Sequence, residues 1–338
     1  MEVKGGERYI PLDIMSLHSA ERDNLTRWQN QAPFYEVYYL KWNNVAEQTA
    51  FWLRYTLLTP KGRPPEASLW GMYFDGKDPK KNFFIKETVP FDQVKFEPYF
   101  FFISIKSSSL FQEGARGSLK QGNHSLEWDL QFTDSISLRH YPTPLYFLPL
   151  PKTKFLAPHL SMKVTGTIVV DGKTLTLQQL PGHQAHFWGT QQASRWAWAH
   201  CNTFDDPQVV LEALTAQISL GTKLSPPLTL FFVSVDGQRY ACHQPYHWWK
   251  NRSTYDQQSW HLEATSGPYY FVVDLTAHPE DQMKVPYEDP DGSQRLCLST
   301  HLADVQLDIL KKSDGHWNLS RRCIATRSAA FEVVETVT

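Results

Sequence analysis

Apolar and polar side chains alternate with a period of two along most of the chain. In Phe51–Leu58 the odd-numbered positions are Phe, Leu, Tyr and Leu, and the even-numbered ones are Trp, Arg, Thr and Leu. Successive side chains of a strand point to opposite faces, so this run predicts a strand covered at least partly on both faces. The same pattern predicts strands over Leu69–Phe74, Phe100–Ile105, Ser125–Phe132, Val164–Val170, Thr174–Gln179, Leu228–Val235, Tyr269–Leu275 and His301–Leu310.

Turn signals separate these strand-like runs. Asp-Gly occurs five times, and it suits tight hairpin turns because glycine lacks a Cβ atom and aspartate tolerates positive φ. Asp171-Gly172 lies between two strand-like runs and predicts a hairpin. The best helical pattern covers Ile14–Gln31. Five prolines in Tyr141–Pro158 argue against a central strand there and predict an extended crossing or a loop. Many strands without alternating helices predict an all-β fold of antiparallel barrels or sandwiches.

Composition narrows the functional classes. With 35 acidic and 33 basic side chains the net charge is −2, which argues against a nucleic-acid binder and against a polybasic membrane-surface protein. No stretch approaches the roughly 20 apolar residues of a membrane helix, and the N-terminus has no apolar signal-peptide core. We therefore expect a soluble cytoplasmic protein with no transmembrane segment; a peripheral membrane contact and the oligomeric state stay open. The four cysteines are far apart, which favours buried free thiols.

Common enzyme motifs are missing from the sequence. It contains no GxGxxG, no GxxxxGK[ST], no GxSxG and no HExxH. His183 and His186 are three residues apart and would point to opposite faces of a strand unless the chain turns there. No nearby acid completes that pair or the set Cys242, His243 and His247. We therefore expect no metal site and no cofactor.

The segment richest in candidate chemistry is Pro181–Asp206. Alternation places Gln184, His186 and Trp188 on one strand face. A second face carries Trp196, Trp198, His200 and Asn202. Two such strands folded against each other would form an aromatic wall with a few polar groups, which suits a hydrophobic ligand or a cationic intermediate. An aromatic core with hydrogen-bonded polar tips explains the pattern equally well.

The run GHQAHFWG followed by WAWAHCN resembles the signature of the tandem-lipocalin proteins that include carotenoid 1,2-hydratase, the AttH-like proteins and the lipocalin-type Diels–Alderases. It also resembles the central motif of tocopherol cyclase. FWLRYTLLTP and ASLWGMYFD are similar to first-barrel strands of the AttH-like group. The resemblance implies two lipocalin-like antiparallel β-barrels in tandem. Residues 1–180, with an irregular N-terminal segment, would form the first and residues 181–338 the second, with a lipophilic pocket near the Trp-Gly run.

This chain departs from the resemblance at two positions. Ala185 stands where the relatives carry Asp or Glu, and Phe187 stands where they carry Asn. His186 or His200 could replace the missing acid, because imidazole titrates near neutrality. We predict these two histidines as catalytic residues. The candidate ligand-binding residues are Trp188, Trp196, Trp198, Asn202, Arg54 and Trp52.

Two further features have two interpretations each, and a third is a single candidate residue. Arg54 is either an anchor for an anionic group or a barrel-rim residue paired with an acid. Tyr246–Trp249 is an aromatic cluster that suits a pocket rim or packing between barrels. Glu212 is a minor candidate acid.

The leading functional hypothesis is a cofactor-independent enzyme, of the lyase or isomerase class, that acts on a hydrophobic isoprenoid or polyene-type small molecule. Hydration, cyclisation or isomerisation would proceed by acid–base chemistry in a shaped pocket. The alternative is a non-catalytic carrier of a lipophilic ligand. A third hypothesis is a structural protein whose barrels are filled by their own side chains. A titratable group that faces a cavity would distinguish the enzyme from the carrier.

Overall fold

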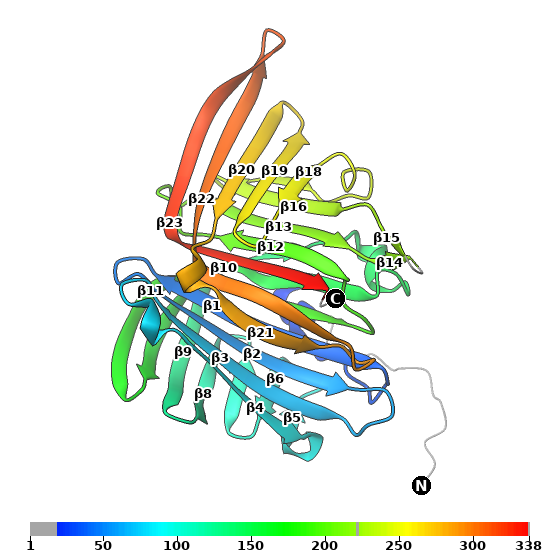
Figure 1. Ribbon diagram of the computed structural model, residues 1–338, viewed down its shortest axis with the longest axis vertical. Helices are drawn as coiled ribbons and strands as arrows, with labels where there is room; N and C mark the ends of the chain where they lie inside the picture. The colour runs from blue at the N-terminus through cyan, green and yellow to red at the C-terminus, as the bar shows by residue number, and fades with distance from the viewer. Residues whose placement is uncertain (1–18, 221–222, 337–338) are drawn as a thin grey trace.

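The computed structural model describes residues 19–220 and 223–336, and these form two large antiparallel sheets (Figure 1). The first has eleven strands in the order β4-β3-β2-β1-β11-β10-β9-β8-β7-β6-β5. Their bounds are β1 (Phe34–Asn44), β2 (Thr49–Thr59), β3 (Glu66–Asp75), β4 (Phe83–Pro90), β5 (Val94–Phe96), β6 (Phe102–Ile105), β7 (Ser108–Phe111), β8 (Gly114–Gln121), β9 (His124–Arg139), β10 (Thr153–Val170) and β11 (Lys173–Gly189).

The second sheet has ten strands in the order β17-β16-β13-β12-β23-β22-β20-β19-β18, and β21 pairs with β22 beside this path. Their bounds are β12 (Arg195–Cys201), β13 (Val210–Gln217), β16 (Leu228–Val235), β17 (Gln238–Cys242), β18 (Arg252–Tyr255), β19 (Ser259–Ser266), β20 (Tyr269–Thr276), β21 (Met283–Glu288), β22 (Gln294–Ser313) and β23 (His316–Thr336). A small hairpin is formed by β14 (Ser219–Leu220) and β15 (Lys223–Leu224).

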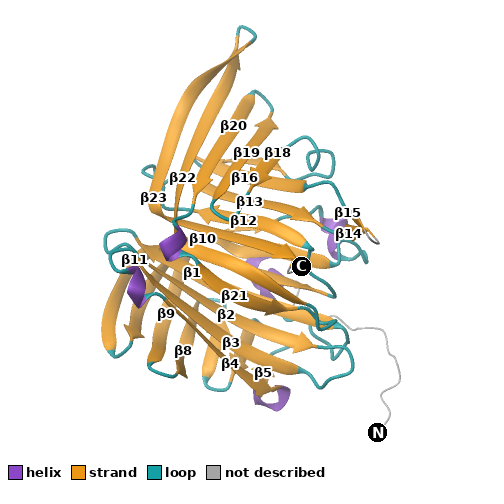
Figure 2. Ribbon diagram, viewed as in Figure 1, coloured by secondary structure: helices purple, strands orange, loops and turns teal. Residues whose placement is uncertain are grey.

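Helical structure is sparse among the described residues (Figure 2). It consists of α2 (Ser19–Asn24) and the single turns η1 (Pro79–Lys81), η2 (Phe91–Gln93), η3 (Thr143–Tyr146) and η4 (Pro279–Asp281). No helix in the described part of the chain is long and apolar enough to cross a membrane.

Each sheet encloses its own core, as the alternation predicts. The first sheet rolls until β4 approaches β8 and β9, which makes a nearly closed barrel. Buried side chains such as Trp42, Phe51 and Tyr55 fill its interior. The second sheet curves around a separate core that includes Phe231, Trp260 and Phe331. The predicted all-β class with two lipocalin-like units is therefore confirmed.

Turn chemistry behaves as the sequence predicts. Asp171 has a φ of 48° and Gly172 a φ of 83°, and the pair joins β10 to β11. Asp236-Gly237 and Asp314-Gly315 turn the chain in the same way between β16 and β17 and between β22 and β23.

Two predictions of local structure were wrong. Ile14–His18 lie outside the described residues, and the helix predicted to reach Gln31 ends at Asn24. The Glu36 carboxylate accepts the backbone N–H groups of Arg27 and Trp28, each at 2.7 Å, so a side chain takes donors that a continuing helix would use.

The proline-rich segment is a loop only as far as Lys152. From Thr153 the chain enters β10, which pairs with both β9 and β11. Pro158 is tolerated because the pairing slips between Leu156 and His159, so no ladder hydrogen bond is required of its nitrogen.

The two sheets pack against each other through their outer faces. Figure 1 shows β12 and β23 above β1, β2 and β21. A third apolar cluster fills this interface, with Tyr35, Tyr39 and Trp52 from the first sheet and Trp198 and Tyr287 from the second half of the chain. The chain changes sheet over residues 190–194, whereas the predicted boundary at residue 180 lies within β11.

Candidate functional site

A cavity of about 440 Å³ lies between the two sheets. Its walls come from both halves of the chain and from the loops at one side of the interface. The lining is mostly aromatic and aliphatic, and among the described residues its charged side chains are Arg54, Lys152 and Glu332. This size and composition suit a small hydrophobic molecule with one polar end.

Four of the predicted site residues line this cavity. Trp52 and Arg54 reach it from β2, and Trp196 and Trp198 reach it from β12. Phe187, which stands at the position where the relatives carry Asn, also lines it. The other four predicted residues, which are His186, Trp188, His200 and Asn202, do not.

The alternation along β11 explains this division. β11 and β12 belong to different sheets, so they do not fold against each other as neighbouring strands. The face of β11 that meets the second sheet carries His183, Ala185 and Phe187, whereas His186 and Trp188 point to the opposite side. Sequence reasoning chose the face with the imidazole and indole side chains, although the other face lines the interface.

His186 is fully buried and holds the segment before β1 in place. Its Nδ1 donates to the Asp23 carbonyl at 2.7 Å, and its Nε2 donates to Glu36 Oε1 at 2.8 Å. Both ring nitrogens therefore face acceptor oxygens, and the ring pairs with the buried carboxylate. The imidazole also stacks on Tyr38 with ring centroids 4.2 Å apart. The predicted catalytic role of His186 stays a prediction, since these contacts use both of its N–H groups.

His200 and Asn202 connect the two sheets. His200 Nε2 donates to the Leu160 carbonyl at 2.8 Å, and Asn202 Nδ2 donates to the Gly182 carbonyl at 2.9 Å. Burial lowers the pKa of His200 well below its ordinary value, and nearby His183 adds to the effect. The imidazole is therefore neutral at pH 7 and lacks the proton that a general acid needs. Its catalytic assignment also stays a prediction.

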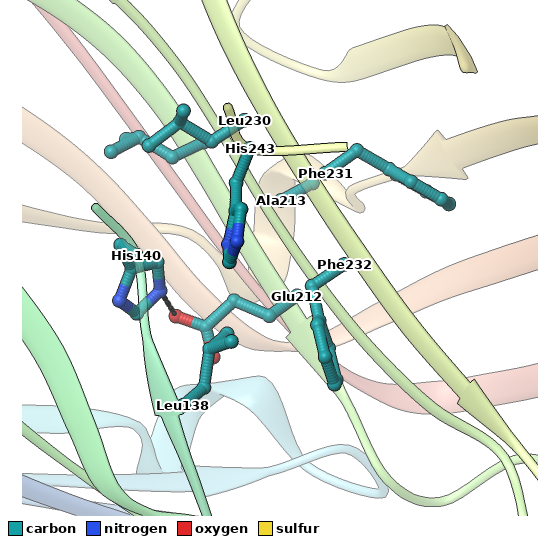
Figure 3. A pocket seen from close by; sticks show the side chains of 9 residues that line it. Leu138, His140, Glu212, Ala213, Leu230, Phe231, Phe232 and His243 are labelled. Atoms are coloured by element: carbon teal, nitrogen blue, oxygen red, sulfur yellow. Dashed lines mark hydrogen bonds and ion pairs between the residues drawn. The ribbon is translucent and has the colours of Figure 1, made fainter. Parts of the chain in front are cut away.

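A buried polar cluster lies beside the cavity. Glu212 Oε1 accepts a hydrogen bond from His140 Nε2 at 2.8 Å (Figure 3). It accepts a second from Trp198 Nε1 at 3.2 Å. Burial raises the pKa of Glu212, but His140, His183 and the hydrogen bonds outweigh it and hold that pKa below its ordinary value. Burial lowers the pKa of His183 to about 4. Glu212 is thus a carboxylate rather than a proton donor at neutral pH.

This cluster includes three side chains with the donor types of a metal site. One donor atom each of His183, His200 and Glu212 lies within 4.8 Å of the others. His183 Nδ1 and Glu212 Oε2 are 3.9 Å apart, whereas tetrahedral zinc holds its ligand atoms at about 3.3 Å from one another. His183 Nδ1 also lies 3.1 Å from the Leu160 carbonyl, which suits an N–H donor. We interpret the cluster as hydrogen-bonded side chains: His183 and His200 both face the Leu160 carbonyl of β10, and Glu212 joins β13 to Trp198 of β12.

The acid that faces the cavity is Glu332, which sequence reasoning missed. It lies on β23 directly opposite Trp198 and is 9% exposed. The Tyr287 and Ser299 hydroxyls donate to its two oxygens, each at 3.5 Å. Burial raises the pKa of Glu332 to about 7, and Arg54 limits that rise. Its signal in the sequence is a lone carboxylate inside the apolar run AAFEVV, where Ala330 and Val334 share its face.

Arg54 is the cationic partner of this acid across the cavity wall. It is 4% exposed, and its Nε donates to Thr56 Oγ1 at 2.9 Å. Its guanidinium lies over the rings of Tyr287 at 4.4 Å and Trp70 at 4.8 Å. These ring faces hold the charge in an apolar setting, so Arg54 is positioned to attract a partial negative charge on a ligand.

The raised pKa of Glu332 predicts how stability depends on pH. Between about pH 4.5 and 7 the folded protein keeps this carboxyl protonated, whereas the unfolded chain ionises it. Unfolding then releases a proton, so a rising pH favours the unfolded state. The free energy of unfolding should therefore fall relative to Glu332→Gln, by about 3 kcal/mol in total, and level off above about pH 7. Urea titrations of both proteins between pH 4 and 8 measure this difference. Parallel curves for the two proteins would contradict the assignment.

Comparison with known proteins agrees with the fold. The tocopherol cyclase-like family profile matches residues 156–335, which is more than half of the chain. Two uncharacterized Mycobacterium tuberculosis proteins, MT0513 of strain CDC 1551 / Oshkosh and Rv0493c of strain H37Rv, are each 24% identical over 308 residues. In both cases the match covers 87% of this chain and 86% of the relative.

Two solved structures share the architecture at low sequence identity. A putative AttH from Nitrosomonas europaea has a TM-score of 0.54 at 11% identity and covers 92% of this chain and 95% of its own. CghA with Sch210972 has a TM-score of 0.57 at 10% identity and covers 90% of this chain and 89% of its own. The motif GHQAHFWG followed by WAWAHCN, the two-sheet fold and the family profile thus agree, and the chain belongs to the tocopherol cyclase-like family.

Proposed function

We propose that this protein is a cofactor-independent enzyme that binds a hydrophobic isoprenoid or polyene-type molecule between its two sheets and rearranges it by proton transfer from Glu332. The observation that carries the proposal is a protonatable carboxyl in the wall of a mostly apolar cavity. CghA, which shares the fold, was solved with the small molecule Sch210972, and this supports a small-molecule ligand here.

The geometry supports a simple acid–base cycle. Protonated Glu332 gives its proton to a double bond or carbonyl of the bound ligand, and the carboxylate that forms is stabilised by Arg54 and by the Tyr287 hydroxyl. Loss of a different proton from the ligand to this carboxylate completes an isomerisation or cyclisation. Attack by water, whose proton returns to Glu332, completes a hydration. The faces of Trp52, Trp196 and Trp198 shape the ligand and stabilise positive charge on it.

A carrier of a lipophilic ligand is the second candidate function. It is favoured by Ala185, which places a methyl group where the relatives of the sequence motif carry an acid. Both candidates require the same cavity, and only the enzyme requires Glu332.

Native mass spectrometry of the protein purified from its own source tests the ligand directly. We expect a bound small molecule that organic extraction releases and that partitions into the apolar phase. Ala216→Trp places an indole in the cavity wall. It should reduce the occupancy of the bound molecule at least tenfold, because the indole takes up volume that the molecule needs. Glu127→Trp, at an exposed position of β9, is the matched control and should keep the ligand. Equal occupancy in both variants would place the ligand elsewhere, and its absence from the parent protein would count against both functions.

A further inference from the structure

The mouth of the cavity is surrounded by exposed apolar side chains. They lie in three segments: residues 141–152, residues 218–220 with 223–224, and residues 243–250, which we call the mouth segments. Of the fifteen exposed large hydrophobic side chains in the described chain, eight lie in these segments. They include Phe147 at 84% exposure and Trp249 at 62%. Contiguous exposure of this kind marks an interaction surface rather than ordinary surface scatter.

All three segments belong to one place on the molecule. Each contributes a side chain to the cavity wall, namely Leu150, Leu220 and Trp248. The first and third touch directly, because the rings of Tyr141 and Trp248 are 6.5 Å apart. Figure 1 shows β14 and β15 of the second segment together at one edge of the molecule. The exposed apolar tips therefore lie on segments that also line the cavity.

The mouth segments are built to hold their apolar tips outward. Lys154 is buried, and its Nζ donates to the carbonyls of Leu145 at 2.6 Å and Leu148 at 2.7 Å, which braces the turn that carries Phe147. In the third segment Trp248 Nε1 donates to the His243 carbonyl at 2.7 Å. These internal contacts fix the loops without using the side chains of Phe147 and Trp249.

The charge at the mouth differs from that of the whole chain. The protein carries a net charge of −2, yet residues 141–158, 213–235 and 237–255 contain no Asp or Glu. Lys152, Lys223 and Lys250 are exposed beside the apolar tips. Aromatic and aliphatic tips flanked by lysines, with no acid among them, match the interface of an anionic bilayer, where rings sit at the headgroup level and lysines meet lipid phosphates.

We propose that the mouth segments dock the protein on the surface of an anionic lipid bilayer, with the cavity opening toward the acyl chains. The proposal rests on the proposed function in one respect: a hydrophobic ligand would then pass between membrane and cavity without crossing water. A bilayer fits better than a protein partner because the apolar side chains are separate loop tips that can enter a fluid interface, and the positive charge surrounds them.

Vesicle sedimentation tests this proposal with the full chain. Vesicles of phosphatidylcholine with about 30 mol% phosphatidylserine should bind the protein, and vesicles of phosphatidylcholine alone should bind it more weakly. The triple variant Phe147→Ser, Leu148→Ser and Trp249→Ser should lose at least tenfold in affinity, since none of these side chains lines the cavity. Lys152→Gln with Lys250→Gln should lose about fivefold per lysine on the anionic vesicles only.

The matched control is the triple variant Tyr99→Ser, Trp317→Ser and Leu319→Ser, which removes exposed apolar side chains far from the mouth segments in sequence. It should bind vesicles like the parent protein. The proposal would be overturned if the parent protein bound neither kind of vesicle. Equal losses of vesicle affinity in the two triple variants would also overturn it. A dimer in light scattering that only the mouth variant dissociates would overturn it in favour of a second copy of the chain. The ligand occupancy of the mouth variant is measured by native mass spectrometry after loading in detergent. This measurement separates failure of the docking proposal from failure of the proposed function.

Discussion

Glu332→Gln is expected to lower turnover of the cavity's ligand at least a hundredfold while changing its binding little. Glutamine keeps the size and polarity of the side chain but has no proton of suitable acidity, so only the proton-transfer step is lost. In the parent protein the rate should be highest below about pH 7 and fall above it, because the protonated carboxyl is the active form. Single-turnover assays on the extracted ligand across pH measure both effects.

Glu280→Gln is the control for this experiment, because Glu280 is exposed on η4 and does not line the cavity. It should react like the parent protein. His200→Ala provides the competing test. A hundredfold loss in that variant, with full activity in Glu332→Gln, would return the proton transfer to the imidazole predicted from the sequence. No conversion by the parent protein, despite a bound ligand, would favour the carrier.

Glu36→Ala is expected to lower the free energy of unfolding by about 3–5 kcal/mol. The Glu36 carboxylate is fully buried and accepts the Tyr38 hydroxyl and His186 Nε2, each at 2.8 Å, in addition to two backbone N–H groups. Alanine would leave these buried donors without an acceptor. Denaturant titration at pH 7 measures the loss.

The control is Glu47→Ala, which removes a surface carboxylate whose partner is Lys77 at 3.0 Å. Exposed pairs contribute little, so its effect should stay below about 1 kcal/mol. Limited proteolysis gives a second readout, because Glu36→Ala should open the chain around Arg27 and Trp28 to cleavage. Equal stability of the two variants would show that the His186–Glu36 pair is dispensable.

The sequence predicts the strands better than the site. Period-two alternation is a local property, and it identified both faces of Phe51–Leu58 and the turn at Asp171-Gly172 correctly. Which face of β11 meets the second sheet depends on how two sheets dock, and no local signal encodes that. The imidazole and indole of His186 and Trp188 therefore looked like the site, although Phe187 between them lines the cavity.

The acid of the site was missed for a related reason. Glu332 is 145 residues from Phe187 along the chain, and only the pairing of β12 with β23 brings it beside Trp198. A carboxylate in an apolar strand signals a buried polar role, but the sequence does not say which cavity it faces. Trp52, Arg54, Trp196 and Trp198 line the cavity because both faces of their strands are covered, so either choice of face leads to a buried environment. Their ligand-binding role stays a prediction.

The placement of the cavity between two self-contained cores also has an evolutionary consequence. Alternate residues of β2 and β12 serve different purposes: Leu53 and Tyr55 belong to the first core, while Trp52 and Arg54 face the cavity. A mutation in the cavity wall therefore leaves the packing of each core intact, and a mutation in a core leaves the wall in place. Selection can change the shape and charge of the wall one residue at a time without first rebuilding a fold, which allows one scaffold to diverge toward chemically unrelated ligands.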